Sequence, residues 1–376
     1  MRGAGHSPPI STRAVGVATL ARQHLLERVD MPAEKMIEHL VGMQAQAPFP
    51  PYFGLWSRIA NFRPEELSGL IDTARVVRIV AMRGTVHLVS ARDAAFLRPL
   101  VQPIMDGDLL TNQLHRHALD GADLPAIVRA ANSKMADGPC TTTELGAHLS
   151  PLFPEIAQPS LVHAVRNLIP VVQAPPRAVW GKSGQVRLVP LEQWAGVALD
   201  VAPSLERLLF RYLAAFGPAS VADAQTWSGL TKLSEVMERI RPRLVTFTAE
   251  SGAELFDLPD APRPDPDTRI PVRIVAAFDN VILAHSDRSR ILSAEAKAKL
   301  STVNGVFPPV VLVGGQVVGQ LKMTTTKTSS VITVTPYRRL PKAAMASIAA
   351  EARRMSRFAV SDVDVDQHEV TFSEAR

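Results

Sequence analysis

Two glutamines separated by one alanine, Gln44 and Gln46, have the types and spacing in this chain that most suggest chemistry. Prolines follow at positions 48, 50 and 51, and a proline disfavours helical backbone in the residue before it, so we expect extended chain here. Residues two apart in extended chain point to the same side. Two amides side by side can hold a water molecule or grip a sugar-phosphate. On the residues alone, a structural role remains favoured, in which the amides cap a helix end and brace the following wing.

Other signatures of catalysis do not occur in the sequence. It contains no G-x-x-x-x-G-K-[ST] loop, no G-x-G-x-x-G, no H-E-x-x-H and no G-x-S-x-G turn. His115 and His117 are two residues apart, so on a helix they point to nearly opposite sides and cannot share one metal ion. Asp362, Asp364 and Asp366 alternate without the glycine and terminal glutamate of a calcium loop, which favours a solvated acidic stretch. We therefore predict neither a metal site nor a cofactor.

Helical and strand-like patterns alternate along the chain in a recurring order. Helices are expected at 15–29, 33–43, 124–136, 142–149 and 159–168. Strand-like segments at 76–82 and 85–89 form a first hairpin, and further small hairpins follow the helices of 124–194 and 203–259. Helices followed by a two-stranded hairpin are typical of a winged helix. We therefore predict an α+β protein with tandem winged-helix (helix-turn-helix) units.

A stretch rich in proline and aspartate, residues 260–267, marks a boundary after the third unit. Beyond it the chain becomes strand-rich, with Gly314-Gly315 as a hairpin turn, and an amphipathic helix starts at Pro341. The predicted domains are three winged helices and a β-rich C-terminal part, at residues 1–95, 96–200, 201–260 and 268–376.

The composition is that of a globular protein inside the cell. Hydrophobic residues make up 46% of the chain, yet no apolar run reaches the roughly 18 residues of a membrane span. The N-terminus lacks the apolar segment of a secretory signal, and the single cysteine, Cys140, cannot form an internal disulfide. We expect a cytoplasmic location and no membrane partner. The net charge of +5 permits nucleic-acid binding on a local patch without requiring it.

The segment from Leu40 to Arg58, LVGMQAQAPFPPYFGLWSR, resembles the bacterial winged-helix DNA glycosylases of AlkZ type, which include azinomycin-resistance proteins. Further segments support the resemblance in the family's order, at 82–89, 211–220, 227–230, 278–290 and 311–319. Together they span almost the whole chain. Lys322 and Met323 depart from the family pattern, which often has a Trp-Arg pair at this point of the late hairpin.

The resemblance implies a C-shaped monomer of three winged helices and a β-rich C-terminal part, with double-stranded DNA in the concave channel. It also implies removal of bulky or alkylated purines, a range that includes natural-product adducts and interstrand crosslinks. The family's catalytic signature of glutamine, apolar residue and glutamine corresponds to Gln44, Ala45 and Gln46. A sister branch has aspartate at the last position, so Gln46 places this chain on the crosslink-resistance side.

The chemistry that glutamines can perform limits the substrate. A side-chain amide is not a base at neutral pH, so this pair cannot deprotonate water as a carboxylate would. An N7- or N3-alkylated purine, however, is cationic and already a good leaving group. Oriented water and dipoles that stabilise oxocarbenium-like charge on the sugar then suffice. We expect monofunctional hydrolysis of alkylated purines of the N7-alkylguanine type, and little activity on neutral bases such as uracil.

A net charge of +5 over 376 residues is too low for strong DNA binding everywhere, so phosphate contacts are expected to concentrate along the channel. The predicted DNA-binding residues are Arg83, Thr85, His87, Arg288 and Lys322. The three cations among them are set among apolar strand or turn residues. Arg288 has an alternative role, pairing with Asp287 or Asp279 to pin the C-terminal part, and Arg83 could equally brace its own turn.

Two other functions fit the same elements. Winged helices are more often regulators, and a fold alone does not decide function. A non-catalytic DNA-binding regulator, or a resistance protein that only sequesters a drug or its adduct, would shift DNA in a gel without liberating a base. Base release therefore separates a glycosylase from both alternatives.

Overall fold

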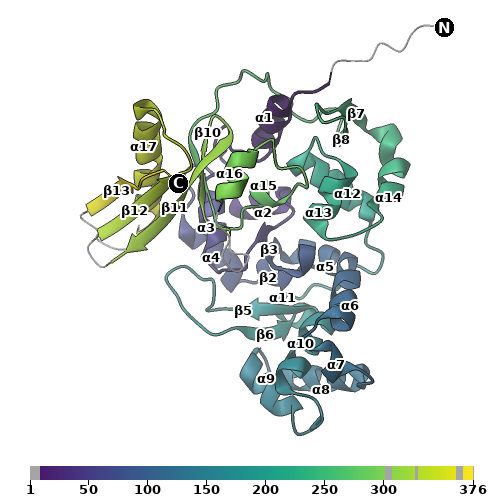
Figure 1. Cartoon of the computed structure of the whole chain (residues 1–376). Helices are drawn as coiled ribbons and strands as arrows, with labels where there is room; N and C mark the ends of the chain where they lie inside the picture. The colour runs from purple at the N-terminus through teal and green to yellow at the C-terminus, as the bar shows by residue number, and fades with distance from the viewer. Residues whose placement is uncertain (1–8, 301–306, 327–328, 361–366, 376) are drawn as a thin grey trace, which may run out of the picture.

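The computed structural model describes residues 9–300, 307–326, 329–360 and 367–375 of the chain (Figure 1). Its first part has four helices, α1 (Thr12–Arg22), α2 (Ala33–His39), α3 (Pro50–Trp56) and α4 (Pro64–Asp72). The hairpin β2 (Val76–Val80) and β3 (Val86–Ser90) follows, which confirms the strands predicted there. The sequence patterns do not predict the short strand β1 (Met43–Gln44). It pairs with β3 and so adds the glutamine motif to this hairpin.

A second group of helices shares its sheet with the first hairpin. The group comprises α5 (Ala91–Leu100), α6 (Gln102–Thr111), α7 (Arg116–Leu119), α8 (Leu124–Ala136), α9 (Thr142–Leu149), α10 (Gln158–Leu168), α11 (Leu191–Ala195), β4 (Cys140–Thr141), β5 (Val171–Ala174) and β6 (Arg187–Pro190). Because β5 pairs with β2, one six-stranded sheet forms in the order β1-β3-β2-β5-β6-β4. The predicted boundary between residues 95 and 96 falls inside α5, and the division into domains stays a prediction.

A third group and a C-terminal sheet complete the chain. The third group is α12 (Leu205–Phe216), α13 (Val221–Ser228), α14 (Leu233–Ile240) and the hairpin β7 (Val245–Thr248) and β8 (Glu254–Asp257). After the proline-rich stretch come β9 (Arg273–Val275), α15 (Asn280–Leu283), α16 (Ala294–Lys299), β10 (Val310–Val313), β11 (Gln316–Thr325), β12 (Ser329–Pro336), α17 (Lys342–Ala359) and β13 (Gln367–Phe372). Gly314 and Gly315 both have positive φ at the tight β10–β11 turn, which glycine adopts without steric cost.

The first hairpin lies at the centre of the molecule, with the C-terminal sheet and α17 on one side and α12–α14 on the other (Figure 1). Val77, Ile79 and Val89 belong to the hydrophobic core that includes α12–α14. Val76 and Leu88 belong to a second core that includes α2–α4, β11, β12 and α17. A hairpin buried on both faces is a rigid support for side chains at its turn and edge. None of the described helices is long and apolar enough to cross a membrane.

Candidate active site

The two glutamines lie on one face of an extended segment at the sheet edge. Gln44 lies opposite His87 in the antiparallel pairing of β1 with β3. Met43 and Ala45 are buried, whereas Gln44 is half-buried and Gln46 is exposed. This alternation has the period of extended chain, so both amides face the same way.

Groups that can only donate fix the orientation of both amides. Gln44 Oε1 accepts a hydrogen bond from Arg83 Nη2 at 2.8 Å, and Gln46 Oε1 accepts one from the backbone N–H of Val86 at 3.3 Å. A guanidinium and a backbone N–H offer no acceptor, so each amide oxygen must face its protein partner. Neither side-chain NH2 has a hydrogen-bond partner among the described residues. The pair therefore presents donors to an approaching ligand.

Arg83 holds the motif against two distant parts of the chain. Besides its bond to Gln44, its guanidinium donates to Asn280 Oδ1 at 3.1 Å and to the backbone carbonyl of Trp227. Trp227 belongs to α13 and Asn280 begins α15, so one side chain joins three segments. Gly229 permits this approach, because a Cβ there would lie 2.9 Å from Arg83 Cα. Within the described part of the chain, no carboxylate pairs with Arg83.

His87 lies behind Arg83 with its imidazole fully buried. Its Nδ1 is 2.9 Å from the carbonyl oxygen of Thr85, and its Nε2 is 3.4 Å from Arg83 Nη2. A carbonyl oxygen can only accept a hydrogen bond, so Nδ1 carries the proton. Arg83 can only donate, so Nε2 is an acceptor and the ring is neutral. Burial, together with the charge of Arg83, lowers the pKa of His87 to about 3. Burial, together with the charge of Arg288, lowers the pKa of Arg83 to about 10, so this guanidinium stays protonated at neutral pH.

A second arginine braces the motif from the other face of the sheet. Arg78 in β2 pairs with Leu88, the residue after His87, so its side chain lies on the face of the sheet opposite to that of His87. Its Nη2 donates to the carbonyl oxygen of Ala45 at 2.7 Å. Arg78 is 2% exposed, and its Nε and Nη1 have no hydrogen-bond partner among the residues that the structure describes. Burial and the nearby charge of Arg177 lower the pKa of Arg78 to about 10. Two arginines that form no ion pair with a carboxylate of the described residues thus flank the glutamine motif.

Three of the eight described non-glycine residues with positive φ lie in the segments that form the site. Val41, Arg83 and Phe278 have φ values of 54°, 56° and 59°, in the left-handed region that non-glycine residues rarely adopt. Val41 precedes β1, Arg83 forms the hairpin turn, and Phe278 precedes α15. Each such residue costs of order 1–3 kcal/mol, which the surrounding contacts must offset.

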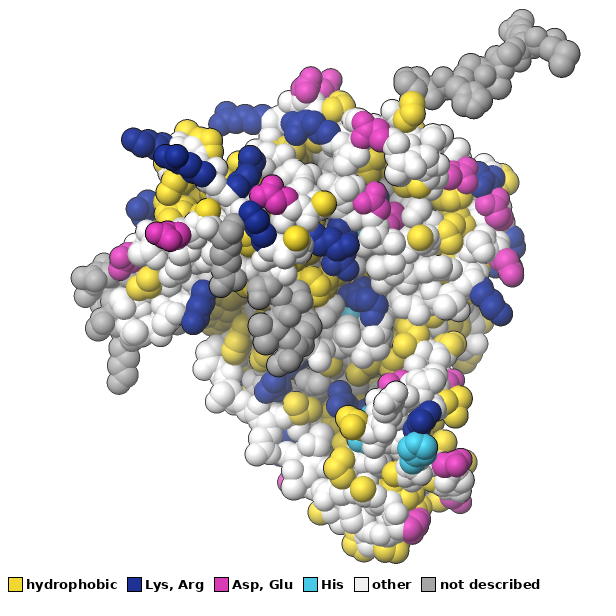
Figure 2. Space-filling view, viewed as in Figure 1, with side chains coloured by type: hydrophobic (Ala, Val, Ile, Leu, Met, Phe, Trp, Pro, Cys, Tyr) yellow, Lys and Arg dark blue, Asp and Glu magenta, His cyan; other side chains and the backbone are white. Residues whose placement is uncertain are grey.

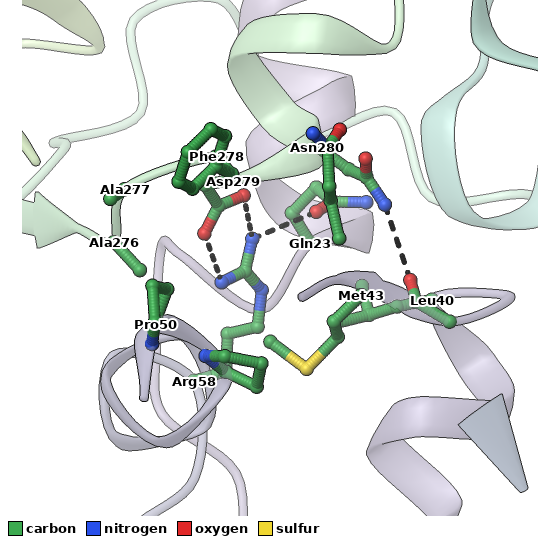
Figure 3. Close-up of a pocket in the computed structure, with 13 residues that line it drawn as sticks. Gln23, Leu40, Met43, Pro50, Arg58, Ala276, Ala277, Phe278, Asp279 and Asn280 are labelled. Atoms are coloured by element: carbon green, nitrogen blue, oxygen red, sulfur yellow. Dashed lines mark hydrogen bonds and ion pairs between the residues drawn. The ribbon is translucent and has the colours of Figure 1, made fainter. Parts of the chain in front are cut away.

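A small pocket lies beside Gln44, between β1, the start of α3 and the segment before α15 (Figure 3). In its wall, both guanidinium nitrogens of Arg58 that face Asp279 lie 2.8 Å from a carboxylate oxygen, and both side chains are buried. Gln23 Oε1 accepts a further bond from Arg58 at 3.0 Å. Asp279 is the carboxylate among the residues that line this pocket, and Arg58 occupies both of its oxygens. It is therefore not free to act as a base.

Residues 37–358 match the family described as "DNA glycosylase AlkZ-like", a range that contains the glutamine motif, Arg83 and all the pocket residues except Gln23. The chain belongs to the AlkZ-like DNA glycosylase family. Among solved structures, the Streptomyces sahachiroi DNA glycosylase AlkZ is similar in fold, with a TM-score of 0.78 at 19% sequence identity, over 97% of this chain and 100% of that chain. No curated protein matches the sequence significantly.

The residues predicted to bind DNA in this AlkZ-like chain have different surroundings. Arg83 and His87 are engaged inside the protein, as described above. Thr85 is half-buried, and its hydroxyl donates to the carbonyl oxygen of Met82 at 3.2 Å. Lys322 is exposed on β11. Their contacts with DNA stay predictions.

Arg288 remains a candidate for a phosphate contact. Its guanidinium lies over the Phe307 ring, 5.7 Å from the centroid, and its Nε donates to the carbonyl oxygen of His285 at 3.4 Å. Asp279 is already paired with Arg58, so the alternative ion pair between Arg288 and Asp279 is not formed. No ion pair of Arg288 with Asp287 occurs in the described ranges. Figure 2 shows several Lys and Arg side chains in the middle of one face, among hydrophobic ones.

The sequence alone does not identify the residues that support the glutamines, except that it gives one partial indication for Arg78. Arg78 interrupts the apolar run Val76–Val80, and a charge inside a buried strand requires an acceptor such as the Ala45 carbonyl.

Among the described residues, no cluster of three or more His, Cys, Asp or Glu can hold a metal ion. The alternating aspartates at 362, 364 and 366 lie outside the described residues.

Proposed function

We propose that this AlkZ-like protein is a monofunctional DNA glycosylase that hydrolyses the N-glycosidic bond of bulky or N-alkylated purines, of the N7-alkylguanine type, in double-stranded DNA. Gln44 and Gln46 are the residues assigned to the reacting nucleotide. The observation that carries the proposal is their paired outward NH2 groups, whose oxygens are held by donor-only partners. A C-shaped monomer with β2–β3, β5–β6 and β7–β8 as the wings of three winged helices belongs to the same proposal.

The proposed chemistry suits a base that leaves easily. As the glycosidic bond of an N7-alkylguanine breaks, electron density moves onto the purine and the sugar becomes oxocarbenium-like. An amide NH2 can donate to an acceptor atom of the departing purine, or hold an attacking water through one of its lone pairs. Fixed dipoles do this without reorganising during the reaction. Because Arg58 occupies Asp279, no free carboxylate among the described residues of the pocket activates water for a neutral base such as uracil.

Base release tests the proposal directly. Duplex DNA containing N7-methylguanine should lose that base in the presence of the protein, in EDTA and without ATP, and free base is measured by mass spectrometry. Heat or alkali should then cut the strand at the abasic site. A gel shift without release at excess protein would refute catalysis and support a regulator or an adduct-binding protein.

Alanine variants test the assignment of the glutamines. Gln44→Ala and Gln46→Ala should each slow release by roughly 10–1000-fold, the scale of losing one preorganised dipole, with little change in melting temperature. Gln113, an exposed glutamine in the α6–α7 connection, provides the matched control, and Gln113→Ala should keep full activity. A fall in melting temperature proportionate to the loss of activity would instead indicate a structural role for the two amides.

A further inference from the structure

An apolar groove lies next to the pocket that contains Gln44. Its volume is about 510 Å³, and apolar residues from α3, β11 and α17 line it, among them Phe49, Phe53, Leu321, Met323 and Met355. The groove and the Gln44 pocket share three wall residues, Pro50, Ala276 and Ala277. A ligand held at Gln44 is therefore adjacent to the groove, and any large substituent on it must be accommodated on this side or in solvent.

The two walls of the groove differ in stiffness. Phe49 and Phe53 pack against Trp180, each with ring centroids 5.9 Å apart, and Phe53 also packs edge-on against Phe358 at 5.6 Å. This aromatic cluster keeps one wall rigid. The other wall includes the thioether side chains of Met323 and Met355, which are flexible and polarizable and so fit groups of varied shape. A groove with one rigid and one flexible wall can bind flat apolar groups of different shapes.

The rim of the groove carries a cation. Lys322 lies between Leu321 and Met323 in β11, and it is exposed. Among the described residues, no acidic side chain lines the groove and none forms an ion pair with Lys322. An apolar groove with an unpaired cation at its edge is complementary to a ligand that joins an apolar substituent to a phosphate-bearing strand.

We propose that this groove receives the apolar, preferably aromatic, substituent of a bulky alkylated purine whose base lies at Gln44. The inference rests on the proposed function and adds a subsite that sets the substrate range. The volume is within the range of roughly 300–1,000 Å³ typical of small-molecule sites, so a naphthylmethyl group fits and a methyl group leaves the groove empty. The groove therefore contributes binding free energy for bulky lesions and none for small ones.

Binding to two modified duplexes tests the subsite without requiring catalysis. One duplex carries N7-methylguanine and the other N7-(naphthylmethyl)guanine, both on 2′-fluorinated sugars, which slow loss of the base. Wild-type protein should bind the naphthylmethyl duplex more tightly by at least roughly 10–200-fold, the range for a single methylene in a hydrophobic pocket. Met323→Trp, which fills the groove, should abolish most of this preference and leave affinity for the methyl duplex unchanged.

Met345 provides the matched control, because it is a half-buried methionine of α17 that does not line the groove. Met345→Trp should keep the wild-type preference. Met323→Gln, which keeps the side-chain length and removes apolar character, gives the same test if tryptophan at this position disturbs folding. Equal wild-type affinity for the two duplexes would overturn the assignment. So would an equal loss of affinity for both in the Met323 variants, which would indicate that the groove contacts the DNA backbone.

The same duplexes with ordinary deoxyribose keep the two proposals apart. If they release no base while the 2′-fluorinated pair shows the Met323-dependent preference, catalysis fails and the groove assignment stands. If both bases are released but the preference is absent, the groove assignment fails and the proposed function stands.

Discussion

Replacing Gln44 with glutamate separates two roles that alanine cannot separate. Glutamate has the same length, keeps an oxygen toward Arg83 Nη2 and exchanges the outward NH2 for a second oxygen. Arg83 has no carboxylate partner among the described residues, so the variant gains an ion pair with a largely buried guanidinium. The wild-type bond already has a charged donor and belongs to the class that contributes about 1.5–3 kcal/mol, so the variant adds only the attraction between the two opposite charges. Because desolvation of the half-buried carboxylate offsets part of this gain, we expect stability to stay unchanged or to rise by about 1 kcal/mol.

The two roles of Gln44 predict opposite changes in rate. If the NH2 acts on the substrate, Gln44→Glu should slow excision by roughly 10²–10³-fold, the cost of removing one preorganised donor. If an oxygen of Gln44 instead orients water, a carboxylate, which can also take up the proton, would serve as well or better, and the rate would be kept or raised. The amide orientation imposed by Arg83 predicts the loss.

Single-turnover excision of N7-methylguanine at saturating protein is the appropriate assay. Saturation removes the effect of weaker binding, which a new negative charge near DNA phosphates is expected to cause. Gln113→Glu adds the same charge at an exposed position in the α6–α7 connection and should excise at the full rate. Full or increased activity of Gln44→Glu would refute the donor role, and a clear drop in its melting temperature would refute the contact with Arg83.

Two further predictions concern pH and salt. His87→Asn should flatten the pH dependence of stability between about pH 3 and 6.5, because His87 has a pKa of about 3 when folded and the unfolded chain binds its proton at about 6.5. The wild-type residue therefore contributes stability that is complete above pH 6.5 and is lost on acidification, by up to about 1.4 kcal/mol per pH unit; parallel slopes for both proteins in urea titrations would contradict this. Lys322→Ala and Arg288→Ala should each lower the salt slope of DNA binding by about one, and unchanged slopes would reject these phosphate contacts.

Local signals in the sequence predict some of the helices closely. The helices expected at 124–136 and 142–149 coincide with α8 and α9, because both beginnings are encoded nearby. The Asp123 side chain caps α8, and Thr141 and Glu144 form a capping box at α9. By contrast, the helix expected at 15–29 ends at Arg22, where the chain turns and His24 adopts a φ of 52°.

Pairings between distant segments are not visible in the sequence. β1 is two residues long and exists because β3 is beside it, and the bond between β2 and β5 that unites two hairpins has no local signature. The site shows the same division. Extended backbone at the glutamines follows from the nearby prolines, whereas the partners of Arg83 lie 144 residues away at Trp227 and 197 residues away at Asn280.

The chemical type of the group that holds each glutamine decides whether its oxygen or its NH2 faces a ligand. A carboxylate in place of Arg83 would accept from the NH2 of Gln44 and turn its oxygen outward, toward the positive charge of an alkylated purine. Oxygens directed at the purine would stabilise the cationic ground state, which lowers the energy of the bound substrate and leaves a higher barrier to departure, whereas oxygens directed at the sugar would stabilise its oxocarbenium-like charge. Outward NH2 groups do the reverse, since they favour the electron-richer, neutral base that forms as the bond breaks. Because Arg83 and the Val86 N–H can only donate, they turn the NH2 groups of Gln44 and Gln46 toward the ligand. These groups therefore stabilise the departing base more than the positively charged bound substrate.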